Sequence, residues 1–262
     1  MHRWRIKWLF GKPDMMTERL LDRQTRLIHF LTSSGAIFGD PDHRPHAVLR
    51  GMDRHILGLE ARFSFEKRMK KIDALLPRTF DLLGPGRMSL TREFVEAYPP
   101  THIGRFENVR QFCDFLASRD RRKSPVPPYL PDVAVCELAI ATARLRTEEG
   151  SPAGQYSSIE GRTPPRSIRR SPAAVLLRVS YDIRAIFESA SEAIDPVARD
   201  VRLAIVATAG GKPPEIFELP PAVFDLLAVL DAWADATTFG EWADAGETMA
   251  ELVRARLLEV HR

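Results

Sequence analysis

Residues 201–219 read VRLAIVATAGGKPPEIFEL, and this stretch decides how the second half of the chain folds. Apolar residues alternate with other residues in 201–206, and an apolar pair stands between two glutamates in 215–218. Both patterns are typical of short, half-buried β-strands. The glycines and prolines of residues 210–214 separate the two runs and favour a turn. The stretch therefore predicts a β-hairpin.

Elements of both kinds surround this hairpin. Apolar residues recur at helical spacing in 222–234 and 247–260, which predicts two amphipathic helices. Residues 175–179 predict another strand, and residues 185–193 predict a short helix. Together these elements predict a small winged-helix-like domain with a short antiparallel sheet, a fold that grips either DNA or an extended peptide.

The preceding part of the chain has a different pattern. Apolar stripes with three- and four-residue spacing predict five or six helices with short connections, which is typical of an α-helical bundle. Residues 148–172 are rich in Gly, Ser, Pro and Arg and have almost no large apolar side chains, so they predict an exposed linker. We therefore expect an α+β protein with three parts: a helical bundle domain at 1–147, a linker or long loop at 148–172, and a winged-helix-like peptide-recognition domain at 173–262.

Charge divides the chain in the same way. The net charge of +3 hides ten more Lys and Arg than Asp and Glu in residues 1–173, and seven fewer in residues 174–262. Such a division favours two parts with different partners. A DNA reader needs Lys and Arg on its recognition helix, and residues 222–246 contain neither. The charge pattern therefore favours an extended peptide over nucleic acid.

The chain carries no recognisable catalytic or metal-binding motif. It has no nucleophile-elbow serine, no phosphate-binding glycine loop and no paired cysteines at zinc spacing. His43 and His46 have acidic neighbours, but the surrounding prolines favour a polar loop over a metal site. We expect no catalytic residue, metal ligand or cofactor in this chain, and we interpret Cys113 and Cys136 as buried, inert thiols.

The same features predict a cytoplasmic location. Two cysteines, and an N-terminal segment without a long apolar core or a small-residue cleavage site, are typical of a reducing compartment. No run approaches the roughly 18 apolar residues that a membrane span requires. We therefore expect no membrane partner.

Several short motifs resemble the methanobactin biosynthesis family MbnC. They are Lys67-Arg68-Met69-Lys70-Lys71-Ile72, Leu76-Pro77-Arg78-Thr79-Phe80, Phe94-Val95-Glu96-Ala97-Tyr98-Pro99-Pro100, Phe112-Cys113-Asp114-Phe115-Leu116, and Tyr129-Leu130-Pro131-Asp132-Val133-Ala134 before Glu137. The similarity covers most of residues 17–260, and its motifs are packing and contact signatures rather than catalytic residues. Members of this family are partner subunits of multinuclear iron-dependent oxidases.

The resemblance implies a non-catalytic subunit of a heterodimer. The iron and the dioxygen chemistry would belong to the oxidase, MbnB, and the substrate would be the precursor peptide MbnA. This chain would bind the leader segment of that peptide and hold its cysteines near the iron. The overall reaction would convert cysteine to an oxazolone with a neighbouring thioamide, a four-electron oxidation in the biosynthesis of a copper-chelating natural product.

Two sets of residues are candidates for these contacts. An extended peptide that adds to the edge of the hairpin would gain backbone hydrogen bonds. The candidate peptide-binding residues are Arg202, Leu203, Ile205, Glu215, Ile216, Phe217 and Glu218. The candidate oxidase-facing residues are Tyr98, Pro99, Arg105, Asn108 and Arg110, together with the basic pair Arg68 and Lys71. Ordinary hairpin packing, a helix end and a solvated helix face are the alternatives for these residues.

Two other functions stay open at this point. A winged-helix DNA-binding regulator would bind duplex DNA with an affinity that falls as salt rises. A stand-alone helical enzyme would show turnover or bound metal in the isolated chain. The heterodimer hypothesis predicts neither, and expects exposed apolar surface on the isolated subunit.

Overall fold

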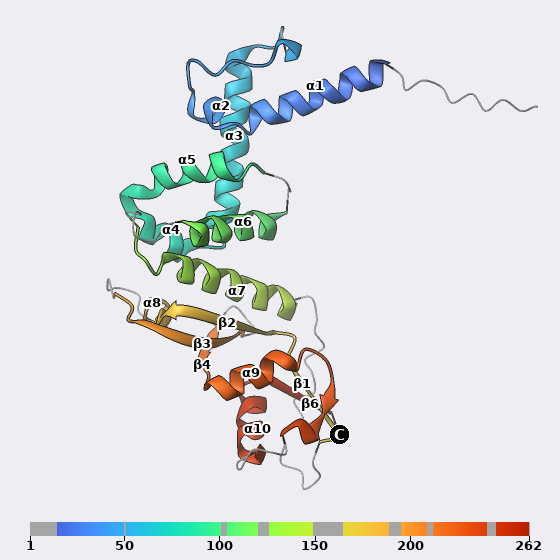
Figure 1. Cartoon of the computed structure of the whole chain (residues 1–262), viewed down its shortest axis with the longest axis vertical. Helices are drawn as coiled ribbons and strands as arrows, with labels where there is room; N and C mark the ends of the chain where they lie inside the picture. The colour runs from blue at the N-terminus through green and yellow to red at the C-terminus, as the bar shows by residue number, and fades with distance from the viewer. Residues whose placement is uncertain are drawn as a thin grey trace, which may run out of the picture. The chain divides into compact units, whose positions relative to one another are not determined.

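The computed structural model describes residues 15–49, 51–100, 104–119, 126–148, 165–188, 195–208, 212–239 and 245–261 (Figure 1). Among the described residues, all regular elements before residue 149 are helices, and every strand lies after residue 166. This distribution confirms the α+β class. The described residues form two compact units, one within Met1–Ile72 and Arg87–Asn108 and the other within Asp73–Gly86 and Val109–Arg262.

The first unit is helical. Its elements are α1 (Met15–Leu31), α2 (Ser34–Phe38), the 3-10 helix η1 (Ala47–Leu49), α3 (Arg54–Asp73), α5 (Arg87–Ala97) and the first turn of α6 (Arg105–Ser118). Its core contains Phe30, Ala36, Ile37, Leu49, Leu57, Ala61 and Val95. Each of these elements except α6 contributes to this core, which explains why the apolar stripes of the sequence predict helices here.

Two residues set the short length of α2. Ser33 caps its first turn, because the Ser33 Oγ accepts a hydrogen bond from the Ala36 N–H at 3.4 Å. Gly39 ends the helix in the left-handed region, with φ of 74°, and its N–H donates to the Gly35 carbonyl. The chain therefore turns sharply between α2 and the loop that leads to α3.

The second unit combines helices with two sheets. Its helices are α4 (Pro77–Leu83), η2 (Gly84–Gly86), the rest of α6, α7 (Leu130–Glu148), α8 (Arg184–Glu188), α9 (Pro221–Val229), η4 (Ala236–Phe239) and α10 (Ala245–Arg254). Its strands are β1 (Ser167–Arg170), β2 (Ala174–Tyr181), β3 (Ala198–Val206), β4 (Glu215–Glu218), β5 (Ala234–Asp235) and β6 (Leu258–His261). They form two antiparallel three-stranded sheets, ordered β2-β3-β4 and β5-β1-β6.

The expected hairpin is confirmed as β3 and β4, and β3 is buried on both faces. Leu203 and Ile205 pack in a cluster with side chains of α7, while Ala204 and Val206 pack in a cluster with side chains of α9 and α10. Successive residues of a strand point to opposite faces, so two helical layers bury the alternate residues of β3. This double burial explains the nearly continuous apolar run at the end of the strand.

The division of the chain differs from the expected domains. Helix α7 was expected to close the helical bundle, but it packs on the sheet that follows it, with Val133, Cys136 and Ile140 in the core that contains Leu203. Its neighbours are therefore β2 and β3 as well as α4. Periodicity identified the helix but could not show which apolar partner covers its buried face.

Three short segments also differ from the sequence prediction. Ser167–Arg170 is strand β1 and not linker, because it pairs with both β5 and β6 and buries Ile168 completely. The predicted helix over 247–260 ends at Arg254, since Arg256 adopts φ of 59° and the chain continues as β6. The predicted helix over 222–234 ends at Val229, and Ala234 begins β5. Of the predicted helix over 185–193, residues 189–193 lie outside the described residues.

Two buried carboxylates of α7 satisfy backbone groups of other elements. Glu137 accepts hydrogen bonds from the Arg78 N–H at 2.8 Å, the Thr79 N–H at 2.9 Å and the Thr79 hydroxyl at 2.7 Å. It thereby caps α4, whose own N-cap residue makes no side-chain bond. Asp132 accepts from the N–H groups of Ser180 and Tyr181, where the register of β2 shifts.

Both cysteines are buried, as the sequence predicted. Burial raises the pKa of the Cys113 thiol to about 12 and also raises the pKa of Cys136. Because the thiolate is the reactive form, we expect neither cysteine of the folded chain to react with Ellman's reagent at about pH 8, where an exposed cysteine is partly ionised. Both should react after unfolding in urea. Rapid release of the chromophore by the folded chain would contradict this prediction.

Candidate functional site

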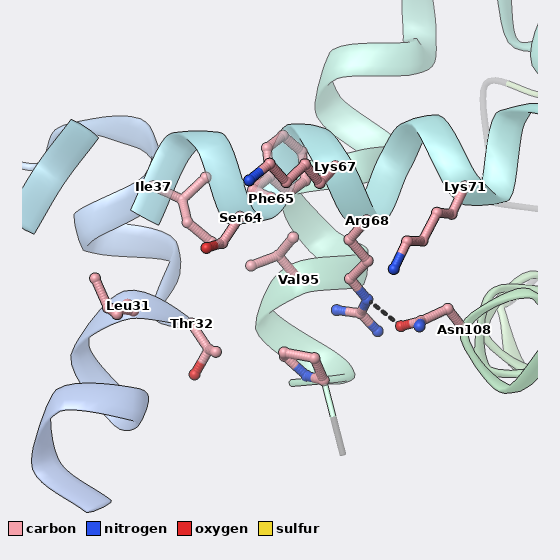
Figure 2. A pocket seen from close by; sticks show the side chains of 11 residues that line it. Leu31, Thr32, Ile37, Ser64, Phe65, Lys67, Arg68, Lys71, Val95 and Asn108 are labelled. Atoms are coloured by element: carbon pink, nitrogen blue, oxygen red, sulfur yellow. Dashed lines mark hydrogen bonds between the residues drawn. The ribbon is translucent and has the colours of Figure 1, made fainter. Parts of the chain in front are cut away.

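A pocket of about 300 Å³ lies in the first unit, and several predicted oxidase-facing residues line it (Figure 2). Its lining residues are Leu31, Thr32, Ile37, Ser64, Phe65, Lys67, Arg68, Lys71, Val95, Pro100 and Asn108. They come from α1 and the residue after it, from α2, α3 and α6, and from α5 and the segment after it. We call this cavity the Arg68 pocket.

Arg68 is fixed in one position at the end of this pocket. Its Nε donates to the Asn108 Oδ1 at 2.8 Å, and its Nη1 donates to the Tyr98 carbonyl at 2.9 Å. The guanidinium carbon lies 4.5 Å from the centre of the Phe94 ring, within the range of a cation–π interaction. Only 8% of Arg68 is exposed, and burial lowers its pKa to about 10. The group therefore stays charged at neutral pH.

Two further cations line the pocket together with Arg68. Lys67 and Lys71 occupy successive turns of α3 and are both exposed. Figure 2 shows Arg68 and Lys71 extending from α3 toward Asn108. The lining residues include no Asp or Glu, and the other walls carry apolar side chains such as Ile37 and Val95. This combination suits an anionic group that is attached to an apolar one.

The structure brings together four of the seven predicted oxidase-facing residues. Arg68, Lys71 and Asn108 line the pocket, and Tyr98 supplies the carbonyl that holds Arg68. The alternative interpretation of Arg68 and Lys71, a solvated helix face, is wrong for Arg68, because its aromatic and amide neighbours bury it. The other three predicted residues are exposed and do not line the pocket: Pro99, Arg105 and Arg110.

Sequence reasoning did not identify the apolar walls of this pocket. Leu31 and Ile37 follow the same helical spacing as ordinary core residues, so their pattern predicts burial alone. Among the lining residues, only Lys67 and Lys71 carried a signal in the sequence, because lysines four residues apart on a helix predict a basic face.

The second candidate site is the outer edge of β4. The Leu219 N–H donates to the Arg202 carbonyl at 2.8 Å, and β4 pairs with β3 in the same antiparallel register. Backbone groups alternate in direction along such a strand. Those of Phe217 therefore face β3, and those of Ile216 and Glu218 face away. Among the described residues no strand pairs with this outer side of β4.

Arg202, Leu203 and Ile205 are not edge residues. They lie on β3, the central strand, which pairs with β2 on one side and with β4 on the other. Leu203 and Ile205 are also completely buried. Their assignment to a peptide-binding edge is therefore wrong, because a two-stranded hairpin pattern does not show that a third strand covers β3. Of the predicted peptide-binding residues, those on the edge strand are Glu215, Ile216, Phe217 and Glu218.

Ion pairs neutralise both glutamates of this edge. The Glu218 carboxylate lies 2.6 Å from Arg199 and 2.7 Å from Arg184, and Glu215 lies 3.1 Å from Arg256. The hydrogen bond from Arg199 is the main cause that lowers the pKa of Glu218. An added peptide would therefore meet paired carboxylates, so backbone hydrogen bonds and the half-buried side chains of Ile216 and Phe217 remain the main recognition elements.

No protein-family model matches the chain, and no curated protein sequence matches it. Within the described ranges, no group of three or more His, Cys, Asp and Glu side chains is arranged to hold a metal ion. The helices of the described ranges include none that is both long enough and apolar enough to cross a membrane.

Proposed function

We propose that this chain is the non-catalytic partner subunit of a cytoplasmic, iron-dependent, peptide-modifying oxidase of methanobactin biosynthesis. The outer edge of β4 is the observation that carries the proposal. It offers the N–H and carbonyl groups of Ile216 and Glu218 to an extended segment, which is the basis of β-strand addition. The leader segment of the precursor peptide MbnA is the proposed added strand.

Prolines limit the length of the segment that this edge accepts. Pro213 and Pro214 precede β4, and Pro220 and Pro221 follow it after a single leucine. Proline has no N–H for a sheet ladder, so the pairing cannot extend far beyond the four residues of β4. The edge therefore favours a short, specific contact over open-ended strand pairing.

The first unit supplies features of a protein interface. Lys67 and Lys71 border the Arg68 pocket, and its walls are apolar. The same unit also exposes a set of large apolar side chains: Leu20, Leu21, Ile28, Ile56, Phe63 and Met88. A subunit of a permanent complex carries such surface until its partner covers it. We propose that this unit binds the oxidase MbnB, with a carboxylate beside an apolar side chain entering the Arg68 pocket.

The division of labour follows from proximity. The oxidase would hold the iron and carry out the four-electron oxidation of cysteine to the oxazolone and thioamide. This chain would hold the leader segment, so that the cysteines of the same peptide encounter the iron at high local concentration. The chain's contribution is then binding and orientation, and it needs no reactive side chain of its own.

Co-expression with the oxidase tests this proposal. We expect an affinity tag on this chain to retain the oxidase together with its iron. Lys71→Glu should strongly reduce this retention, because the new carboxylate repels the acid that we expect in the pocket. Lys70→Glu makes the same charge change at an exposed position of α3 outside the lining, and should retain the complex.

The proposal fails if the chain purifies alone as a monodisperse protein and does not retain the oxidase. Equal retention of the oxidase by both lysine variants would overturn the placement of the Arg68 pocket in the interface. Salt-sensitive binding of duplex DNA by the isolated chain would instead support the winged-helix DNA-binding regulator.

A further inference from the structure

We infer that another pocket of the first unit binds a small organic oxyanion. This cavity has a volume of about 410 Å³ and lies between α2, the loop after it and the first turns of α3. We call it the His43 pocket. It shares no lining residue with the Arg68 pocket, and the proposal is independent of the proposed function.

Glycines give this cavity its space. A Cβ atom on Gly58 would meet no atom within 4 Å, so this helical glycine leaves open volume along α3. Glycine in a helix interior is less stable than alanine, so its presence at position 58 needs a reason. A Cβ on Gly35 would lie only 2.5 Å from the His43 Cγ, so the His43 ring rests directly on the Gly35 backbone. The cavity therefore depends on two positions that lack side chains.

His43 forms a fixed wall of the pocket. The Ser33 Oγ lies 2.7 Å from the Phe30 carbonyl and 2.8 Å from the His43 Nε2. Ser33 therefore joins the His43 ring to the end of α1. The imidazole also stacks on Phe30, with ring centres 5.2 Å apart. These contacts hold a flat aromatic surface against the cavity.

Two arginines supply the positive charge. The Arg54 Nη2 donates to the carbonyls of Pro41 at 2.9 Å and His43 at 3.0 Å, which anchors the loop and fixes this guanidinium at the pocket. The Arg62 guanidinium lies over Gly39, because its Nη2 is 3.6 Å from the position of a Cβ there. Arg62 makes no hydrogen bond or ion pair with another residue in the described ranges. Its donors are therefore available to a ligand.

The one acidic lining residue does not pair with these cations. The Asp40 Oδ1 accepts the Asp42 N–H at 2.9 Å, and the contact between Arg54 and Asp40 uses the Asp40 carbonyl. The exposed His55 also lines the pocket, at the start of α3. Two guanidinium groups around one cavity favour an oxyanion, since their N–H groups match phosphate and carboxylate oxygens. The volume has room for an organic group as well as the anion.

Calorimetric titration of the full chain in phosphate-free buffer tests this inference. The probes are phenyl phosphate, benzoate and benzyl alcohol, which differ in the group attached to one aromatic ring. We expect at least one of the two anions to bind, and the alcohol not to bind. Tighter binding of phenyl phosphate would identify a phosphate ester as the ligand class, and tighter binding of benzoate would identify a carboxylate.

Three variants separate the pocket from general charge effects. Arg62→Gln should weaken binding of the preferred anion by about tenfold or more, since it removes a charged donor. Gly58→Ala should weaken binding because its methyl group enters the cavity, yet it should raise the melting temperature. Lys70→Gln removes a charge on α3 outside the pocket and should not change the affinity.

The inference fails if neither anion binds the full chain, or if the alcohol binds as tightly as the anions. It also fails if the Arg62→Gln and Lys70→Gln variants bind the anion equally well. The melting temperature of each variant shows that it is folded when the titration is made.

Discussion

Replacing Ile216 with proline is expected to abolish leader-peptide capture while the complex with the oxidase still forms. The Ile216 N–H points away from β3, so proline at this position removes a donor of the outer edge without breaking the bonds between β3 and β4. Edge strands tolerate proline where the N–H faces outward. The pyrrolidine ring also occupies the space that an added strand needs. We expect at least a tenfold loss of affinity for a synthetic leader peptide, measured by fluorescence anisotropy.

Ile216→Ala is the matched control for this experiment. It loses the same half-buried side chain but keeps the N–H, so it should bind the leader peptide much more tightly than Ile216→Pro. Phe217→Pro makes the opposite change, because the Phe217 N–H faces β3, and it should lower the melting temperature. Equal peptide affinities for the proline and alanine variants at position 216 would show that the peptide does not pair with β4.

Replacing Glu137 with alanine is expected to lower the free energy of unfolding by about 4 kcal/mol. The change removes the acceptor for two backbone N–H groups and one hydroxyl, all at the start of α4. Each buried donor left without an acceptor costs about 1–3 kcal/mol, and solvent that enters the new space offsets part of that sum. Burial raises the pKa of Glu137, and its three hydrogen bonds oppose that rise. Urea unfolding followed by circular dichroism measures the change.

Two variants show whether the hydrogen bonds of Glu137 cause this loss. Glu137→Gln keeps one acceptor oxygen and nearly the same volume, so it should unfold at a urea concentration between those of the alanine variant and the original chain. Glu148→Ala changes an exposed glutamate at the end of the same helix, and should change stability by less than about 0.5 kcal/mol. If Glu137→Ala lowered the free energy of unfolding as little as Glu148→Ala does, water would be replacing the carboxylate at little cost.

Local patterns predicted the elements whose partners lie close in the sequence. The alternation in 201–206 and the following turn residues were sufficient for the hairpin of β3 and β4. The pattern failed for Leu258–His261, because Leu257 and Leu258 continue the apolar spacing of α10 and no glycine marks the left-handed Arg256. That strand forms because Ser167–Arg170, remote in the sequence, pairs with it.

The candidate sites were predictable only in part, because some of their residues depend on partners that are remote in the sequence. Lys71 stands on a basic helix face that its own neighbours in the sequence reveal. The burial of Arg68 depends on Asn108, which lies 40 residues away, and no local pattern carries that information. The central position of β3 likewise depends on β2, which covers the side of β3 that β4 leaves open. The apolar walls of the Arg68 pocket give no signal that distinguishes them from core.

The position of Glu137 in the chain also sets an order for folding during synthesis. The N–H of Arg78 leaves the ribosome 59 residues before the carboxylate that accepts its hydrogen bond. At a synthesis rate of 5–20 residues per second, this interval lasts roughly 3–12 s. Until it ends, the first turn of α4 has only water for its free N–H groups, and isolated helices of this length are marginal. Helix α4 is therefore expected to become stable only after α7 has been made, so a ribosome that pauses between them holds a nascent chain with an unfinished helix.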